Sequence, residues 1–213
     1  MSRALLSATL LLGLGGPHAF AATPDGLEEI VVTASLRPEP ASRIPVSTTV
    51  LDSATLRTAG LQHFADVLGL VPNLNWAGGT SRPRFFQLRG IGELEQYQGA
   101  PNPSVAFLID EIDFSGVGMP ATLFDVGQIE VLRGPQGTRY GANALAGLIK
   151  LNTRDPEPVS SLQAQAMTGE DGLWSAGVQA GGALESVRDG SAWRLVAQRL
   201  ESDGFRRNTF LRR

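Results

Sequence analysis

The C-terminal part of the chain alternates apolar and polar side chains with a period of two. The alternation covers residues 162–167, 174–180 and 193–198, and an Asp189-Gly190 pair before the last run predicts a hairpin turn. A period of two predicts strands with one apolar and one polar face. Two structures fit such strands equally well: a transmembrane β-barrel with an apolar outer face, and a soluble antiparallel sandwich with one wet face.

The N-terminus predicts export from the cytoplasm. Arg3 supplies a positive charge, residues 5–14 form an apolar run, and an Ala-Phe-Ala sequence at residues 19–21 has the small residues that a signal peptidase accepts. Glycines and Pro17 break the run short of the roughly 20 residues that a membrane helix needs. We therefore expect a signal peptide over residues 1–21, cleaved after its last alanine, rather than a membrane anchor. Any later membrane span must use strands.

Composition argues against several kinds of function. The chain has no cysteine, so it offers neither a disulfide nor a thiolate metal site nor a cysteine nucleophile. A net charge of -3 without a basic stripe argues against nucleic-acid binding. His63 is the only histidine beyond the signal peptide, and we interpret it as a partly exposed helix residue and expect no metal site. Asp110, Glu111 and Asp113 lack a nucleophile or second base, so we interpret them as turn residues and expect no enzyme, no catalytic residue and no cofactor.

Residues 28–34 predict a strand without an obvious neighbour in the sequence. The segment is rich in stiff β-branched residues, and three prolines disfavour a helix just beyond it. An isolated strand on a flexible tether is suited to pair with the sheet edge of another protein. The alternative is that the segment forms the first ordered strand of the domain that follows.

Residues 41–157 predict a domain with short helices and a small mixed sheet. We expect strands at residues 47–51, 85–90, 105–109, 112–114, 127–133 and 148–152. Helices are expected over residues 53–60, capped by Asp52 or Ser53, and over 62–69. Residues 73–84 and 92–103 have the composition of loops, and the Asp-Pro-Glu-Pro sequence at residues 155–158 predicts a rigid linker.

One stretch resembles a known family. Residues 128–137, Gln-Ile-Glu-Val-Leu-Arg-Gly-Pro-Gln-Gly, resemble the signature of the plug domain in TonB-dependent outer-membrane receptors, and residues 88–91 and 107–110 resemble two earlier elements of that domain. The resemblance implies a structural plug motif made of Arg89, Gly90, Glu130, Arg133, Gly134, Tyr140, Gly141 and Gly147. We expect Arg133 to anchor the plug, with Glu130 as a candidate partner. Ala146 and Lys150 depart from the family pattern of paired glycines and an apolar or amide-rich strand.

Residues 29–34 resemble the TonB box of the same family. The resemblance implies that the periplasmic protein TonB binds at Glu29, Ile30, Val31, Val32 and Thr33. It also implies four parts: a signal peptide (1–21), a TonB box and linker (22–40), an α+β plug domain (41–157), and the first antiparallel strands of a transmembrane β-barrel (158–213, about three strands). Because three strands would leave open edges in the membrane, we expect a fragment or a truncated product.

The family resemblance implies active import across the outer membrane of a scarce solute, most often an iron–siderophore complex. Expected partners are TonB with its inner-membrane energising complex, an extracellular ligand such as a ferric siderophore, and outer-membrane lipid. Candidate substrate contacts in the polar loops are Arg82, Arg84, Gln96, Tyr97 and Gln98. A structural role is an equal alternative for the first two, and an internal ion pair is the preferred role for Arg89. The alternative function is a truncated periplasmic plug module that binds TonB without transport.

Overall fold

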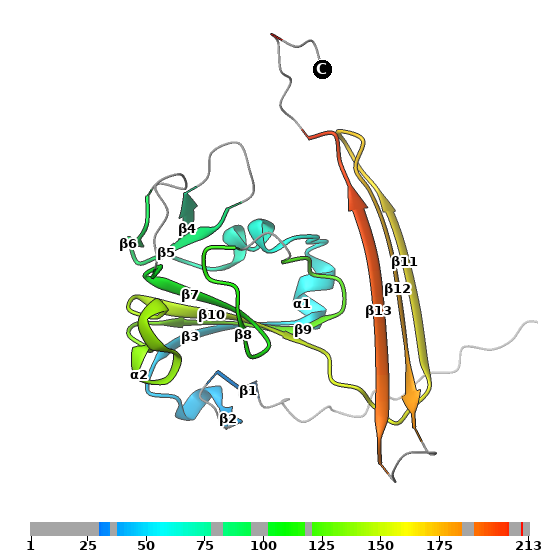
Figure 1. Cartoon of the computed structure of the whole chain (residues 1–213), viewed down its shortest axis with the longest axis horizontal. Coiled ribbons are helices and arrows are strands. Elements are labelled where there is room, and N and C mark those ends of the chain that lie inside the picture. The colour runs from blue at the N-terminus through cyan, green and yellow to red at the C-terminus, as the bar shows by residue number, and fades with distance from the viewer. Residues whose placement is uncertain are drawn as a thin grey trace, which may run out of the picture.

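The computed structural model describes residues 30–34, 38–77, 83–94, 102–117, 121–184, 190–204 and 210. A central five-stranded sheet, two smaller sheets and a few short helices form one body, and a curved three-stranded sheet stands beside it (Figure 1). This arrangement confirms the predicted α+β fold followed by antiparallel strands. In these ranges no helix is both long enough and apolar enough to cross a membrane.

The central sheet holds the body together. Its strands lie in the order β3 (Ser47–Asp52), β9 (Val126–Arg133), β10 (Gly147–Thr153), β7 (Val105–Ile109) and β8 (Ile112–Asp113). All neighbours are antiparallel except β10 and β7, which run parallel. Both faces of β7, β9 and β10 are largely buried. β7 is accordingly a continuous apolar run in the sequence, whereas β9 and β10 also bury the charged residues Glu130 and Lys150.

The remaining elements of the body are short. The helices are α1 (Ser53–Thr58) and α2 (Gly137–Tyr140), with 3-10 turns η1 (Ala41–Arg43), η2 (Phe64–Leu70) and η3 (Gly141–Asn143). The small sheets are β1 (Val31–Val32) with β2 (Glu39–Pro40), and β4 (Leu74–Ala77) with β5 (Phe85–Leu88) and β6 (Ile91–Gly92). The prediction of a loop over residues 73–84 is wrong for β4, which pairs with β5. The apolar residues Leu74 and Trp76 of β4 alternate with polar neighbours, but they lie in a stretch whose overall composition is that of a loop, so the strand was not predicted.

The two predicted helix starts differ in outcome. The Asp52 carboxylate accepts a hydrogen bond of 2.7 Å from the Thr55 amide, so Asp52 caps α1 as predicted, and hydrogen bonds from Thr55 lower its pKa. The prediction that His63 is a partly exposed helix residue is wrong. His63 is 3% exposed and precedes η2 as its N-cap, with Nδ1 accepting from the Ala65 amide at 3.0 Å.

The central sheet separates two hydrophobic clusters. On one face three aromatic rings, Phe64, Phe86 and Phe107, pack with centroids 5.1–5.2 Å apart. The cluster on the other face includes Val32, Ala34, Ala106, Leu108, Leu132, Ala144 and Leu148. Neighbouring residues of β7 alternate between the two clusters, as expected for a strand that is buried on both faces. The N-terminal residues Val32 and Ala34, both 0% exposed, therefore belong to the core.

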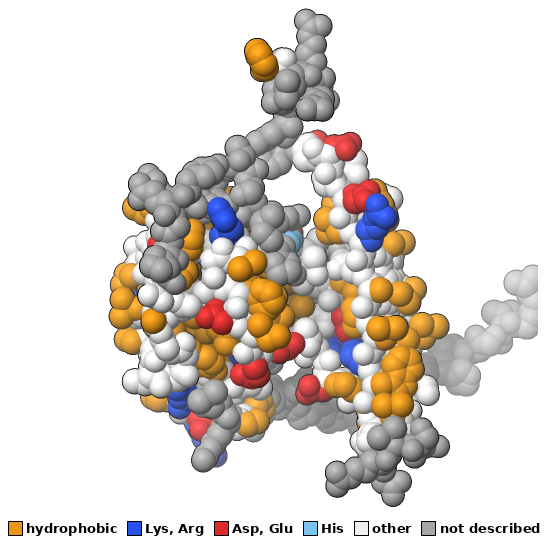
Figure 2. Space-filling view, in the orientation of Figure 1, with side chains coloured by type: hydrophobic (Ala, Val, Ile, Leu, Met, Phe, Trp, Pro, Cys, Tyr) orange, Lys and Arg blue, Asp and Glu red, His pale blue; other side chains and the backbone are white. Residues whose placement is uncertain are grey.

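The predicted C-terminal strands are confirmed as an antiparallel sheet. The strands are β11 (Ser161–Thr168), β12 (Trp174–Ala183) and β13 (Ala192–Glu201). Ser175 and Gln179 face the body and are 6% and 2% exposed, whereas Leu162 and Leu195 face outward and are 78% and 65% exposed. Hydrophobic side chains accordingly line the outer side of this sheet (Figure 2). A soluble sandwich would bury its apolar face, so this structure does not support that alternative.

Candidate functional site

Residues 30–34, called here the N-terminal segment, are docked on the body. Strand β1 pairs antiparallel with β2, and the Ala41 amide donates a hydrogen bond of 2.8 Å to the Ile30 carbonyl. The prediction of a strand without a neighbour in the sequence is therefore wrong. The partner strand leaves no pattern in the sequence because it is two residues long and contains Pro40. Glu29, the first residue of the expected TonB-binding set, lies outside the described residues.

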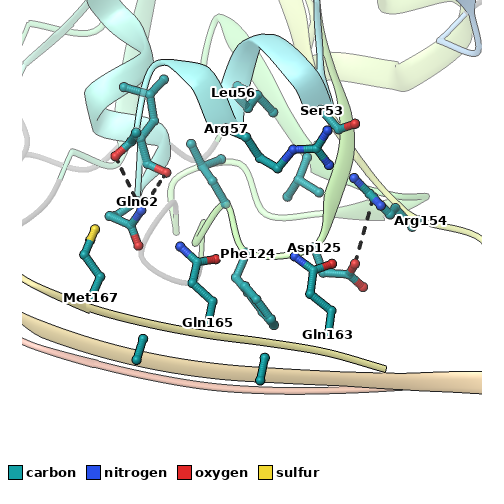
Figure 3. Close-up of a pocket in the computed structure, with 16 residues that line it drawn as sticks. Ser53, Leu56, Arg57, Gln62, Phe124, Asp125, Arg154, Gln163, Gln165 and Met167 are labelled. Atoms are coloured by element: carbon teal, nitrogen blue, oxygen red, sulfur yellow. Dashed lines mark hydrogen bonds and ion pairs between the residues drawn. The ribbon is translucent and has the colours of Figure 1, made fainter. Parts of the chain in front are cut away.

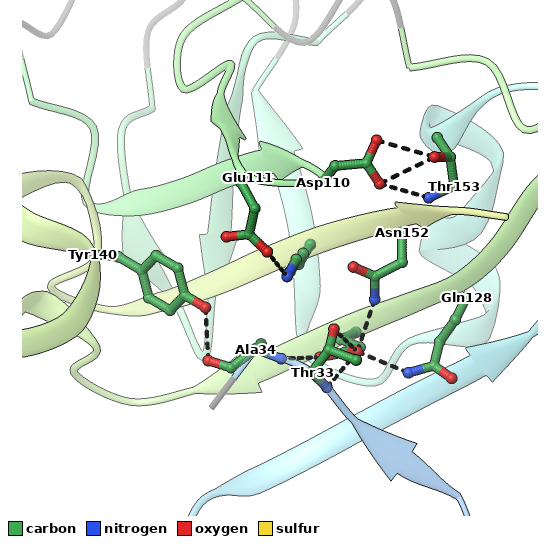
Figure 4. A network of polar contacts seen from close by, with 10 residues as sticks. Thr33, Ala34, Asp110, Glu111, Gln128, Tyr140, Asn152 and Thr153 are labelled. Atoms are coloured by element: carbon green, nitrogen blue, oxygen red, sulfur yellow. Dashed lines mark hydrogen bonds and ion pairs between the residues drawn. The ribbon is translucent and has the colours of Figure 1, made fainter. Parts of the chain in front are cut away.

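The Glu130 side chain of β9 holds the N-terminal segment (Figure 4). Its Oε1 accepts from the Thr33 amide and hydroxyl, both at 2.9 Å, and its Oε2 accepts from the Ala34 amide at 2.8 Å. The side-chain amides of Gln128 and Asn152 donate to Oε1 at 2.7 and 2.8 Å. The carboxylate is 0% exposed, and among the described residues no cation pairs with it.

The side chains of Gln128 and Tyr140 also donate hydrogen bonds to the backbone of the N-terminal segment. Gln128 Nε2 donates to the Val31 carbonyl at 2.9 Å, and the Tyr140 hydroxyl donates to the Ala34 carbonyl at 2.8 Å. Burial raises the pKa of Tyr140 to about 12. The structure thus places the N-terminal segment, which includes most of the expected TonB-binding residues, in contact with Glu130 and Tyr140, two members of the plug motif. The segment and these two residues lie far apart in the sequence. Thr33 and Glu130 are 97 positions apart, so no local pattern joins them.

Arg133 lies on the opposite face of β9 from Glu130. Residues three apart in a strand point to opposite faces, so the expected pair between them is wrong. Arg133 Nη2 instead donates to the Pro72 carbonyl at 3.0 Å. Burial, followed by the charge of Arg89, lowers the pKa of Arg133. No carboxylate of the described residues lies within ion-pair distance of Arg89, which sits in the β5–β6 turn with a φ of 54° beside Gly90.

The departures from the family pattern have local explanations. Gly147 is required, because a Cβ there would lie 2.5 Å from the Leu132 carbonyl oxygen. Ala146 does not have a positive φ, so its methyl group is tolerated. Lys150 is buried and its ammonium lies 2.7 Å from Glu111 Oε1, which neutralises the charge in the sheet.

Asp110 and Glu111 form the turn between β7 and β8, as predicted, whereas Asp113 is the last residue of β8. Asp110 has a φ of 54°, and its Oδ1 accepts from the Thr153 amide at 2.8 Å. Asp113 Oδ1 accepts from the Ser115 amide at 2.7 Å. These contacts join the turn to the end of β10 and to the following loop.

Most expected substrate contacts lie beyond what the structure describes. Arg82, Gln96, Tyr97 and Gln98 are outside the described residues. Arg84 immediately precedes β5, whose sheet lies at the opposite end of the body from β1 and β2 (Figure 1). In the same region, the Glu93 carboxylate accepts from the amide and hydroxyl of Ser104 at 2.9 and 2.8 Å. This contact joins the two chain segments that flank residues 95–101.

The body contacts the three-stranded sheet through Asp125, just before β9. Its side chain is 5% exposed and accepts hydrogen bonds from Nε, at 2.7 Å, and Nη2 of Arg194 on β13. Beside it the Phe124 ring packs on Gly177, where a Cβ would come within 2.9 Å of ring atoms. Neither contact is predicted from the sequence, since Asp125 and Arg194 are 69 positions apart.

A cavity of about 480 Å³ lies between the body and β11. Gln163, Gln165 and Met167 project from β11 toward Arg57 and Asp125 across this cavity (Figure 3). The inner face of β11 therefore lines a space between the two parts of the structure whose walls carry both polar and apolar side chains.

We predict that Asp125 and Arg194 stabilise the structure as a coupled pair. Removing one partner leaves the other charge largely buried, so Asp125→Ala should cost about 3 kcal/mol of unfolding free energy. The double variant with Arg194→Ala should cost clearly less than the sum of the two single changes. Glu201→Ala, which breaks the exposed Arg199–Glu201 pair, is the control and should leave the unfolding free energy almost unchanged. Urea unfolding measures all four variants, and additive costs for Asp125 and Arg194 would contradict the coupling.

A second prediction concerns the Tyr140 hydroxyl. The chain has two tyrosines, so Tyr97→Phe leaves Tyr140 as the only phenol. Ultraviolet absorbance of this variant should show ionisation centred near pH 12, not near pH 10 as for an exposed tyrosine. Because the folded pKa is raised, the stability that Tyr140 contributes is complete below about pH 10 and is lost as the pH rises toward 12. A midpoint near 10 would show that the hydroxyl is not buried against Ala34.

Comparisons with known proteins identify related sequences over most of the plug body. Residues 40–148 match the family described as the TonB-dependent Receptor Plug Domain. The chain is 33% identical over 130 residues to the pesticin receptor of Yersinia pestis, covering 60% of the chain and 19% of that receptor. It is 26% identical over 185 residues to the vitamin B12 transporter BtuB of Vibrio vulnificus, covering 84% of the chain and 28% of that transporter.

Solved structures show the same fold. The ferric yersiniabactin uptake receptor FyuA from Yersinia pestis superimposes with a TM-score of 0.57 at 28% identity, covering 68% of the chain and 23% of FyuA. The pyoverdine outer membrane receptor FpvA from Pseudomonas aeruginosa PAO1 gives a TM-score of 0.67 at 19% identity, covering 82% of the chain and 25% of FpvA. The chain thus spans less than a third of each of these relatives. Since residues 40–148 are more than half of its 213 residues, the chain belongs to the TonB-dependent receptor plug domain family.

Proposed function

We propose that this chain belongs to a receptor of the outer membrane that imports a scarce solute with energy supplied through TonB. The observation that carries the proposal is the orientation of β11–β13. Their polar face turns toward the plug body and their apolar face turns outward, which is the arrangement of strands in a transmembrane barrel. The relatives with matching sequences are named as receptors or transporters, which supports transport rather than catalysis.

The outer face of the sheet has the dimensions of a membrane band. Trp174 and Trp193 lie on this face, and Trp193 pairs with Gly182, eight positions along β12 from Trp174. At about 3.4 Å per residue the two indoles are about 27 Å apart along the strand, which corresponds to a height of about 21 Å for a barrel strand tilted by about 40°. An apolar band about 25 Å tall between aromatic girdles is typical of outer-membrane barrels. The indole of Trp174 also contacts Arg199 and Glu201, as expected for an aromatic residue at a lipid–water interface.

The two ends of the plug receive different roles in this proposal. Glu29, Ile30, Val31, Val32 and Thr33 form the strand that pairs with TonB in the periplasm. The opposite end, with Arg84 before β5, faces the outside, and Arg82, Arg84, Gln96, Tyr97 and Gln98 contact the ligand. A ferric siderophore is the proposed ligand class because the related FyuA is an uptake receptor for ferric yersiniabactin. The arginine side chains suit an anionic chelate, since guanidinium groups bind carboxylates through paired hydrogen bonds.

We predict that Val31→Pro abolishes import without abolishing ligand binding. Proline removes the backbone donor that a paired strand needs at this position, whereas Val31→Ala keeps it and serves as the control. Cells that produce the whole receptor are tested for uptake of a radiolabelled ferric siderophore that the parent imports, and for its binding at the cell surface. Import by the proline variant at the parental rate would remove the assignment of this strand as the TonB contact.

A further inference from the structure

Both edges of the N-terminal segment are occupied. Backbone groups of successive residues in a strand point to opposite edges. On one edge the Ile30 carbonyl accepts from the Ala41 amide, next to the β1–β2 pairing. On the other edge the Val31 carbonyl and the Thr33 amide bond to the side chains of Gln128 and Glu130. A partner strand needs a free edge, so no strand can add to the segment while it is docked.

Glu130 is the main hydrogen-bond acceptor at the second edge, the one formed by Val31 and Thr33. Five donors from the described residues surround its buried carboxylate, and three of them come from Thr33 and Ala34. The other two, Gln128 and Asn152, lie in β9 and β10 and stay with the sheet. Hydrogen bonds to a charged acceptor are stronger than those between neutral groups. The segment therefore supplies most of the donors that make burial of this carboxylate tolerable.

The side chains of the segment strengthen the same contact. Val32 and Ala34 are 0% exposed and pack in the cluster formed with Leu108, Leu132 and Leu148. Ile30 and Val31 are more exposed, at 53% and 38%. Release of the segment would thus expose Val32 and Ala34 and leave Glu130 with two of its five donors.

We infer that Glu130 is a latch for the N-terminal segment: it holds residues 30–34 on the plug in a state that cannot pair with another strand. Docking on Glu130 and pairing with a periplasmic strand exclude each other, because both use the Val31–Thr33 edge. The identity of that strand as part of TonB rests on the proposed function. The latch itself rests only on contacts within this chain.

Thiol labelling tests the latch directly, because these 213 residues contain no cysteine and any cysteine elsewhere in the whole receptor is replaced by serine. Val32→Cys places a reporter in the buried segment, and Val67→Cys places one in the cluster on the other face of the sheet. Glu130→Gln is then added to each reporter in the whole receptor, without TonB. Glutamine keeps one acceptor oxygen but has an NH2 group in place of the other, so donors face each other either at Thr33 or at Ala34, and the segment should undock more often.

We expect Glu130→Gln to raise the labelling rate of the Val32→Cys reporter at least about tenfold, which is the order expected for losing hydrogen bonds to a charged group. The Val67→Cys reporter should stay protected. Thr33→Val, which removes only the hydroxyl donor, should give a smaller rise, and Glu111→Gln, which affects the Lys150 pair, should give none.

Two results would overturn the inference. An unchanged rate at the Val32→Cys reporter would show that Glu130 does not hold the segment. Equal acceleration of both reporters would show that Glu130 supports the whole plug rather than the segment. Neither result involves TonB or import, so failure of the latch is distinct from failure of the import assignment.

Discussion

A buried carboxylate without a cation among the described residues is the constraint on which this structure depends. Glu130 lies inside the sheet, where an ionised group is tolerated only if hydrogen bonds replace its water shell. Gln128 and Asn152 supply part of that replacement from the sheet, and the N-terminal segment supplies the rest. The proposed energy-coupling strand is therefore a component of the plug core, and its release changes the solvation of a charge at the centre of the fold.

Strand β9 connects the functional parts of the molecule. Glu130 on one face holds the N-terminal segment, and Arg133 on the other face donates to the Pro72 carbonyl next to β4. Asp125, immediately before the strand, binds Arg194 on β13. A single strand thus contacts the proposed periplasmic strand, the region near the opposite end of the plug and the wall of the proposed barrel. Because residues of a strand alternate between faces, these contacts do not compete for space.

The sequence predicted the parts of the fold that local patterns determine. A continuous apolar run located β7, and the alternating runs located β11–β13, because burial on two faces or on one leaves a direct signal. The contacts of the site gave no such signal, since Thr33 and Glu130 are 97 positions apart and Asp125 and Arg194 are 69 apart. The expected Glu130–Arg133 pair was one error that strand geometry alone could have prevented. The short β1–β2 pairing could not be found, because proline in β2 masks it.

One measurement tests the role of the latch most directly: the affinity of the whole receptor for the periplasmic domain of TonB. It is measured without ligand, in the parent receptor and in Glu130→Gln. If docking and pairing exclude each other, the parent binds TonB only in its small undocked fraction, and weakening the latch enlarges that fraction. Glu130→Gln should then bind TonB about tenfold more tightly than the parent. Unchanged or weaker binding would contradict the latch, because the docked segment would then be no obstacle to its partner.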